Sequence, residues 1–191
     1  MPLDRLRRDL EAHPAWKVVP GDASPRAAVA LVFRPDEHLL FIERAAREGD
    51  PWSGHMAFPG GRFDPVDASL EATAVRETRE EVGVDLHDAE AFGGLSDLPT
   101  PARVPVNLII SPYVFAVDHD PVVATNHEVA RVHWFALGRL LAHEGRDTFR
   151  REWRGAEWSL PCVRLDGTFL WGITLRILDE ALDRIRRGGG P

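Results

Sequence analysis

The most informative part of the chain reads Phe58-Pro59-Gly60-Gly61 and, fifteen residues after Gly61, Arg76-Glu77-Thr78-Arg79-Glu80-Glu81-Val82-Gly83-Val84. The first part predicts a glycine turn, in which the missing Cβ atoms let the backbone approach an ion or phosphate closely. The second predicts a helix with Glu77, Glu80 and Glu81 at i, i+3 and i+4, on one face. Because like charges at this spacing cost about 0.2–0.5 kcal/mol per pair, the cluster favours a bound cation. Carboxylate oxygens suit Mg²⁺, Mn²⁺ or Ca²⁺ better than Zn²⁺.

This pattern resembles the box of the Nudix hydrolases, GX5EX7REUXEEXGU, in which U is aliphatic. Gly61 corresponds to the first glycine, and residues 76–84 match the second half closely except for Thr78 at an aliphatic position. The first half departs from the box, because Gly61 and Arg76 lie one residue too far apart. Ala68 stands at the position of the first glutamate, and Asp67 or Glu71 could take its place, although neither sits at the expected spacing.

The resemblance implies an α/β/α sandwich with a mixed sheet between helices, and hydrolysis of a diphosphate by metal-activated water. Metal ions would lower the pKa of the bound water and neutralise phosphoryl charge. Either Glu81 or Glu80 is expected to accept the proton of the water, and Arg76 to orient Glu77 or pair with Glu80. Glu128 is an expected ligand or base by resemblance, with an exposed glutamate at a strand entrance as the equal alternative. The expected metal ligands are Glu77, Glu80, Glu81, Gly61 and Glu128, with Mg²⁺ or Mn²⁺ as the cofactor.

Several segments resemble the coenzyme A pyrophosphatase branch of this family. Gly54 and Ala57 to Gly61 match its segment before the box, although His55 stands where the branch has glutamine. Leu170-Trp171-Gly172-Ile173-Thr174 is similar to the Ile-Trp-Gly-x-Thr-Ala that opens the last helix of the branch. This resemblance implies coenzyme A or acyl-CoA as substrate, giving 3′,5′-ADP and 4′-phosphopantetheine.

Three positions near the turn are expected to bind substrate phosphates: Arg44, Arg62 and Gly60. The two arginines can make bidentate hydrogen bonds to phosphate, although exposed ion pairs with Glu43 or Asp64 would explain them equally simply. Two other functions stay open. The altered position His55 keeps ADP-ribose, NADH or a damaged nucleotide as substrates. A non-catalytic nucleotide-sensing module is the alternative of another class, but such a module is expected to have lost box carboxylates that this chain retains.

Composition restricts the remaining choices. The 191 residues fit a single domain over 1–191, with an N-terminal helix at about 1–13 and a flexible glycine-rich tail at 188–191. A net charge of −7 disfavours nucleic-acid or membrane partners and leaves a small nucleoside diphosphate. The single cysteine, Cys162, and the lack of a signal peptide or long apolar span predict a cytoplasmic protein with Cys162 in the core. The amphipathic N-terminal helix fits either a homodimer interface or packing on its own sheet.

Hydrophobic patterns predict the order of elements. Residues 27–33 are apolar throughout, which is typical of a central strand covered on both faces. Ser69 and Gly83 are the expected ends of the box helix. Further strands are expected at 39–42, 91–98, 106–117 (broken near Pro112) and 129–135, with Pro99, Pro101 and Pro105 in a loop that cannot join the sheet. A short helix at 138–143, a hairpin joining 149–153 to 158–165 around Gly155, and a helix over 169–186 complete the prediction.

Overall fold

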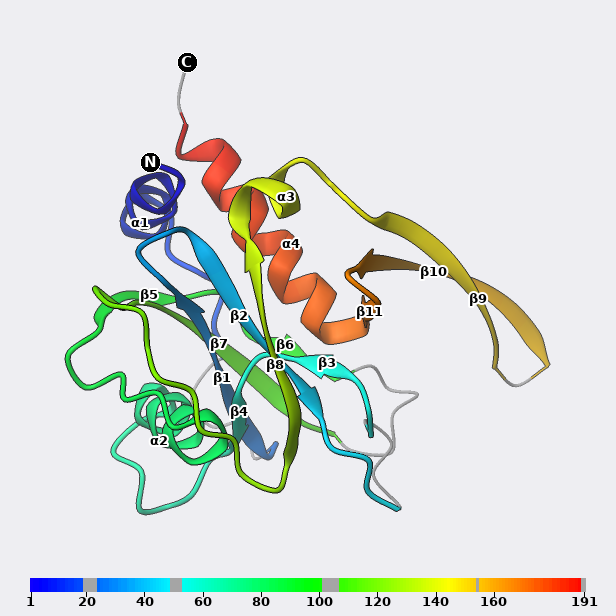
Figure 1. The fold of residues 1–191 in the computed structure, drawn as a ribbon, viewed down its shortest axis with the longest axis horizontal. Coiled ribbons are helices and arrows are strands. Elements are labelled where there is room, and N and C mark those ends of the chain that lie inside the picture. Colours follow the sequence, from blue (N-terminus) through cyan, green and yellow to red (C-terminus); the bar gives the residue numbers. More distant parts are fainter. Residues whose placement is uncertain (19–23, 49–52, 101–106, 154, 190–191) are drawn as a thin grey trace.

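Helices cover both faces of a mixed β-sheet in the computed structural model, which describes residues 1–18, 24–48, 53–100, 107–153 and 155–189 (Figure 1). Eight strands of this described part form the main sheet: β1 (Arg26–Phe33), β2 (His38–Arg44), β3 (Met56–Ala57), β4 (Gly60–Arg62), β5 (Glu90–Gly94), β6 (Leu98–Pro99), β7 (Ile109–Ala116) and β8 (Val129–Ala136). A smaller sheet contains β9 (Arg146–Trp153), β10 (Ala156–Leu165) and β11 (Thr168–Trp171). The helices are α1 (Pro2–Ala12), α2 (Leu70–Val82), α3 (Leu137–Leu141) and α4 (Gly172–Arg187). The expected α/β/α sandwich is confirmed.

Strand β1 separates two hydrophobic cores. Leu31 and Phe33 pack into a core that includes the buried side chains of α1 and α4. Ala28, Ala30 and Val32 point the other way, into a core shared with α2. Because alternate side chains of a strand face opposite sides, a strand with a core on each side must be apolar at every position. The prediction of a doubly covered central strand is confirmed.

The neighbours of β1 position the glycine turn. Along one edge, β1 pairs in parallel with β7, from Arg26↔Ile109 to Phe33↔Ala116. On the other edge β4 pairs with the first half of β1, including Ala28↔Gly61, and β2 meets its end at Phe33↔Leu39. The turn that leads into α2 is therefore held by the central strand.

Two proline predictions were wrong. Strand β7 continues through Pro112, and the Pro112 carbonyl accepts a hydrogen bond from the Leu95 N–H (2.9 Å). The edge of β7 at Pro112 lies beside the break between β5 and β6. No described strand pairs with this edge of β7 at that point, so the N–H that proline lacks is not needed for a hydrogen bond between strands. That break also divides the single strand expected at 91–98. Pro99 belongs to β6, where it pairs with Ile109, as a proline can on a short outer strand. Pro101 and Pro105 lie outside the described residues.

The C-terminal prediction needs one correction. Residues 168–171 form strand β11, paired with β10 through Cys162↔Trp171, and helix α4 begins only at Gly172. Gly172 has φ +68°, a left-handed value that is easy for glycine and ends the strand. The hairpin around Gly155, the short helix, the N-terminal helix and the burial of Cys162 were predicted correctly. Residues 190 and 191 of the predicted tail lie outside the described part.

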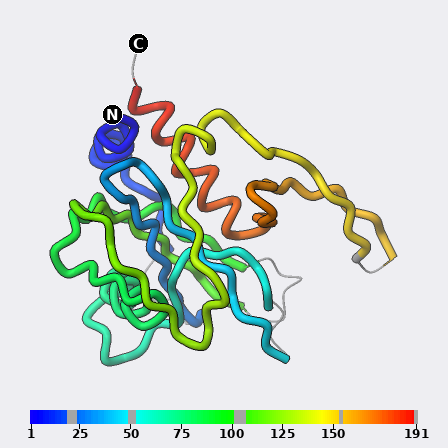
Figure 2. The backbone as a smooth tube through the Cα atoms, viewed as in Figure 1, coloured from blue at the N-terminus to red at the C-terminus, as the bar shows by residue number. Residues whose placement is uncertain are grey.

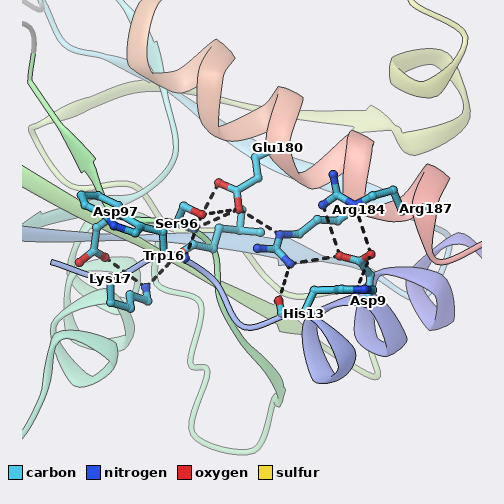
Figure 3. A network of polar contacts seen from close by, with 10 residues as sticks. Asp9, His13, Trp16, Lys17, Ser96, Asp97, Glu180, Arg184 and Arg187 are labelled. Carbon is cyan, nitrogen blue, oxygen red and sulfur yellow. Dashed lines mark hydrogen bonds and ion pairs between the residues drawn. The ribbon is translucent and has the colours of Figure 1, made fainter. Parts of the chain in front are cut away.

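A buried polar network joins the N-terminal helix to the rest of the molecule (Figure 3). Asp9 of α1 accepts a hydrogen bond from Arg184 of α4 (3.1 Å), and their side chains are 0% and 5% exposed. Arg184 also donates to Glu180, which accepts from the N–H and hydroxyl of Ser96. Next to Ser96, the buried Asp97 binds Lys17 and Arg26 of β1. Two helices and the central strand are thus connected by ion pairs and hydrogen bonds around the buried Asp9, Arg184 and Asp97.

Candidate active site

The two glycines of the turn are required for different reasons. Gly60 has φ +153°, and a Cβ there would lie 2.2 Å from the Ala28 carbonyl oxygen of β1. At Gly61 a Cβ would lie 2.3 Å from the carboxylate of Glu77 on α2. The first glycine lets the turn reach the central strand, and the second lets the helix carboxylate reach the turn.

The box helix has the ends that its sequence predicts. The Ser69 hydroxyl accepts the Ala72 N–H (3.1 Å) at its start, and Gly83 ends it with φ +73°. The unusual Thr78 is fully buried, and its hydroxyl donates to the Ala74 carbonyl (2.7 Å), which satisfies the polar group inside the core. The helix can therefore keep its carboxylate face toward the turn.

Arg76 connects the loop before the helix to two of the helix carboxylates. It makes a bidentate ion pair with Asp67, with both N–O distances 2.9 Å. Its third nitrogen donates to Glu77 (2.9 Å) and Glu80 (3.2 Å). Hydrogen bonds from Arg76, which outweigh the opposite effect of burial, together with one from Thr73, lower the pKa of Asp67. Arg76 thus holds both Glu77 and Glu80 from a fixed position.

Asp67 therefore occupies the loop position for which the sequence left Asp67 and Glu71 open. It lies six residues after Gly61, which is the box spacing when the count begins at the glycine. The extra residue falls between Asp67 and Arg76. Counting from both ends of the box would have identified this residue.

Glu81 is the most buried of the helix carboxylates. It is 2% exposed, and its Oε2 accepts the Gly60 N–H (2.8 Å). Burial raises the pKa of Glu81 to about 7, and the charges of Glu77 and Glu128 add to this effect, while the Gly60 N–H and Arg44 oppose it. Burial likewise raises the pKa of Glu77 against the influence of Arg76. By contrast, the Glu80 side chain is 56% exposed.

The loop before β8 brings Glu128 to this cluster. The Asn126 N–H donates to the Glu81 carbonyl (3.0 Å), and the side chain of Asn126 accepts the Glu128 N–H (2.8 Å). The charge of Glu128 raises the pKa of both Glu77 and Glu81, which puts Glu128 within electrostatic range of both carboxylates. Asn126 was not singled out from the sequence, because neither its backbone bond to Glu81 nor its side-chain bond to Glu128 has a sequence signal.

The predicted substrate-binding residues surround the cluster in different ways. Arg44 lies near Glu81 and lowers its pKa. The Arg62 side chain is exposed, and its carbonyl accepts a hydrogen bond from Arg76 (3.3 Å). The structure therefore groups Glu77, Glu81, Glu128 and Arg44, and leaves Glu80 and Arg62 at the solvent edge.

The chemistry of the cluster fits a hard divalent cation. In the described part of the chain, no three or more His, Cys, Asp or Glu side chains are already arranged as a metal site. The carboxylates instead contact Arg76 and the Gly60 N–H. Their oxygen atoms are the donors that Mg²⁺ and Mn²⁺ take. Burial is the main cause of the raised pKa values of Glu77 and Glu81, neighbouring carboxylates add to it, and a bound cation would favour the ionised form of both groups.

Comparison with known proteins agrees with this geometry. A family model described as NUDIX domain matches residues 23–155. The chain belongs to the Nudix family. A Nudix hydrolase named NudL from Cronobacter sakazakii is 33% identical over 156 residues, which are 80% of this chain and 77% of that protein. The human mitochondrial coenzyme A diphosphatase NUDT8 is 29% identical over 172 residues, 87% of this chain and 72% of that protein. A Schizosaccharomyces pombe protein is 38% identical over 68% of this chain but only 41% of its own length.

Solved structures share the Nudix fold. A MutT/nudix family protein from Enterococcus faecalis superposes with a TM-score of 0.61 at 23% identity, covering 89% of this chain and 65% of that chain. The Nudix domain of Shewanella oneidensis NrtR, solved with ADP ribose, gives a TM-score of 0.57 at 18% identity, covering 93% and 97%. The predicted family, fold and class of enzyme, a Nudix pyrophosphohydrolase, are confirmed.

Among the described residues, every helix is too short or too polar to span a membrane.

Proposed function

We propose that this Nudix enzyme hydrolyses the diphosphate of coenzyme A or an acyl-CoA, giving 3′,5′-ADP and a 4′-phosphopantetheine product. The observation that carries the chemistry is the buried Glu81 with the partly buried Glu77 beside the glycine turn, and the exposed Glu128 close enough to raise the pKa of both. The choice of coenzyme A is supported by the similarity to the human coenzyme A diphosphatase and by the sequence around Gly54 and Trp171.

The helix residues have distinct roles in this proposal. Glu77, Glu80 and Glu81, with Glu128 and the backbone of Gly61, would hold Mg²⁺ or Mn²⁺. When bound, the metal activates water and neutralises phosphoryl charge. Arg76 positions Glu77 and Glu80 through its ion pairs.

Glu81 is the better candidate for the base that accepts the proton of the attacking water. Its carboxylate is buried and fixed by the Gly60 N–H, whereas Glu80 is exposed. A base held in one orientation near the reacting atoms transfers protons more efficiently than a mobile one. Arg44, Arg62 and the N–H-rich turn at Gly60 would bind the phosphates around it.

The residue His55 supports a second class of substrate. His55 replaces the glutamine of the coenzyme A branch directly before β3. ADP-ribose, NADH or a damaged nucleotide would then be the substrate of the same carboxylates. A nucleotide-sensing module would bind such a ligand without turnover.

The test is hydrolysis of coenzyme A, acetyl-CoA, ADP-ribose, NADH and 8-oxo-dGTP with Mg²⁺ or Mn²⁺, with products identified by mass spectrometry. Preference for coenzyme A with release of 3′,5′-ADP is expected, and chelation of the metal should stop the reaction. Glu81→Gln should reduce kcat by several orders of magnitude, more than Glu80→Gln. Glu71→Gln, on the same helix, is the matched control and should stay near wild type. Preference for another diphosphate would overturn the substrate, and a wild-type rate in Glu81→Gln would overturn the role of Glu81.

A further inference from the structure

Strand β9 is the outer strand of the smaller sheet and leaves one edge open. Among the described residues it pairs only with β10, from Arg146↔Val163 to Trp153↔Ala156. In Figure 1 and Figure 2 the hairpin of these two strands extends beyond α4, away from the main sheet. An exposed strand edge presents unpaired N–H and C=O groups, so it can pair with a strand of another chain.

The register shows which backbone groups point out from this edge. The Arg164 N–H donates to the Gly145 carbonyl (2.8 Å), so the pair that comes just before β9 is hydrogen-bonded. Because hydrogen-bonded and non-bonded pairs alternate along an antiparallel ladder, positions 147, 149 and 151 direct their backbone groups to β10. Positions 148, 150 and 152 direct theirs to the open edge. There the Thr148 N–H is bonded to the carboxylate of the adjacent Asp147 (2.7 Å), in place of a strand.

A twofold axis between two copies of the chain would place their β9 strands antiparallel, edge to edge. One residue of β9 must then lie opposite itself. A pair of residues and its symmetry copy have the same type of hydrogen bonding, whereas neighbouring pairs alternate, so no axis can pass between two adjacent pairs. The register of such a dimer is therefore fixed by the choice of its central residue.

Charge selects the central residue. Like charges directly opposite each other destabilise a sheet. Most choices bring like charges together, at the centre or two residues from it: Asp147, Thr148, Arg150, Arg151 and Glu152. A centre at Phe149 instead places Arg151 opposite Asp147, and symmetry repeats this pair. It also places Glu152 opposite Arg146. The sequence of β9 is thus complementary to itself in this one register.

The side chains that would meet are already beside the edge. Asp147, Phe149 and Arg151 share a face, as alternate residues of a strand do. The Arg151 guanidinium lies 5.0 Å from the centre of the Trp171 ring, and the Phe149 ring meets Trp171 edge-on at 5.3 Å. Asp147 is 54% exposed and pairs with the equally exposed Arg164, a contact of small energy that it can exchange. Side chains held in place in this way lose less entropy on association.

We propose that the chain forms a twofold dimer in which the two β9 edges pair with Phe149 opposite its own copy. The two smaller sheets then form one sheet of six strands. Thr148 and Arg150 exchange hydrogen bonds between the copies, and the Asp147 carboxylate moves from the Thr148 N–H to Arg151 of the other copy. Helix α1, the interface expected from the sequence, already packs its apolar side chains in the core of its own chain.

The mass of the full chain in solution, measured by sedimentation over a range of concentrations, tests the proposal. Wild type should form a dimer. Arg151→Asp and Asp147→Arg should each weaken dimerisation at least about tenfold, because each creates two like-charged pairs. An equal mixture of these two variants should form the dimer again, since every contact between positions 147 and 151 then joins opposite charges. The variant that carries both changes should also dimerise as wild type does.

Asp183→Arg is the matched control, because it reverses an exposed carboxylate on α4, outside β9, and it should dimerise as wild type does. Thermal unfolding checks that each variant is folded. A monomeric wild type would overturn the proposal, and so would a dimer that Arg151→Asp leaves intact. If the single variants are monomers that do not associate in the mixture, or if Asp183→Arg dissociates equally, the pairing of Asp147 with Arg151 is wrong. None of these outcomes depends on the substrate.

Discussion

Replacing Gly61 with alanine should disturb the position of Glu77 without disturbing the fold. A Cβ at residue 61 would lie 2.3 Å from the Glu77 carboxylate carbon, whereas ordinary contact begins at 3.4 Å, so the carboxylate must move by about 1 Å. A misplacement of this size at a reacting site can lower the rate about 100-fold. The carboxylate ends a flexible side chain, and φ at Gly61 lies outside the left-handed region, so the free energy of unfolding should change by less than about 1 kcal/mol.

Alanine substitutions at two other glycines serve as comparisons for Gly61→Ala. Gly60→Ala should destabilise the protein by more than about 3 kcal/mol, because its Cβ would lie 2.2 Å from the Ala28 backbone oxygen and its φ is +153°. Gly138→Ala in α3 has no atom within 4 Å of the added carbon and should leave activity unchanged. The measurements are kcat/KM with Mg²⁺ on the best substrate and unfolding in urea. A Gly61→Ala enzyme within threefold of wild type would refute the link between this glycine and Glu77.

Three further predictions concern charged groups: Asp67 beside the site, and Asp9 in the network that joins α1 to α4. Asp67→Asn should lower activity about 10- to 100-fold by releasing Arg76 from its bidentate contact, and a Mg²⁺ titration of the rate would show whether metal affinity falls with it. Asp9→Asn should lower the free energy of unfolding in urea by up to about 3 kcal/mol, because it removes one of the two carboxylates that pair with the buried Arg184 and leaves only Glu180; Asp183→Asn, at the exposed pair with Arg186, should cost less than about 1 kcal/mol. Burial raises the pKa of Asp9, but Arg187 and Arg184 outweigh it and the net pKa is lowered, so its contribution is complete above the ordinary value of 3.8 and lost as pH falls through the folded-state pKa. The difference between wild type and Asp9→Asn should therefore be smaller at pH 3 than at pH 7, and an equal difference at both would exclude ionised Asp9 as its cause.

Local sequence signals predicted the elements whose ends are determined locally. Ser69 and Gly83 mark the box helix because a hydroxyl cap and a left-handed residue act within one turn. Pro112 misled the prediction because its effect depends on the strand beside it, and the break between β5 and β6 is a property of the folded sheet. The residues around Pro112 in the sequence do not indicate that the neighbouring strand is interrupted there.

In the site, too, local patterns predict some features, and others depend on contacts between distant segments. Glu77 and Glu81 were identified by their spacing on one helix, and Gly60 and Gly61 by the turn. The approach of Glu128 could be suggested only by resemblance, because it depends on hydrogen bonds between the loop at 124–126 and the end of α2.

The burial of Cys162 gives this protein an internal reporter of local opening. It is the single cysteine of the chain, it is fully buried between β9 and β11, and burial raises the pKa of its thiol. A thiol in this state reacts with a labelling reagent only when the smaller sheet opens. The labelling rate of the unmodified protein therefore measures how often that sheet separates, and a ligand that holds the sheet closed would slow the reaction.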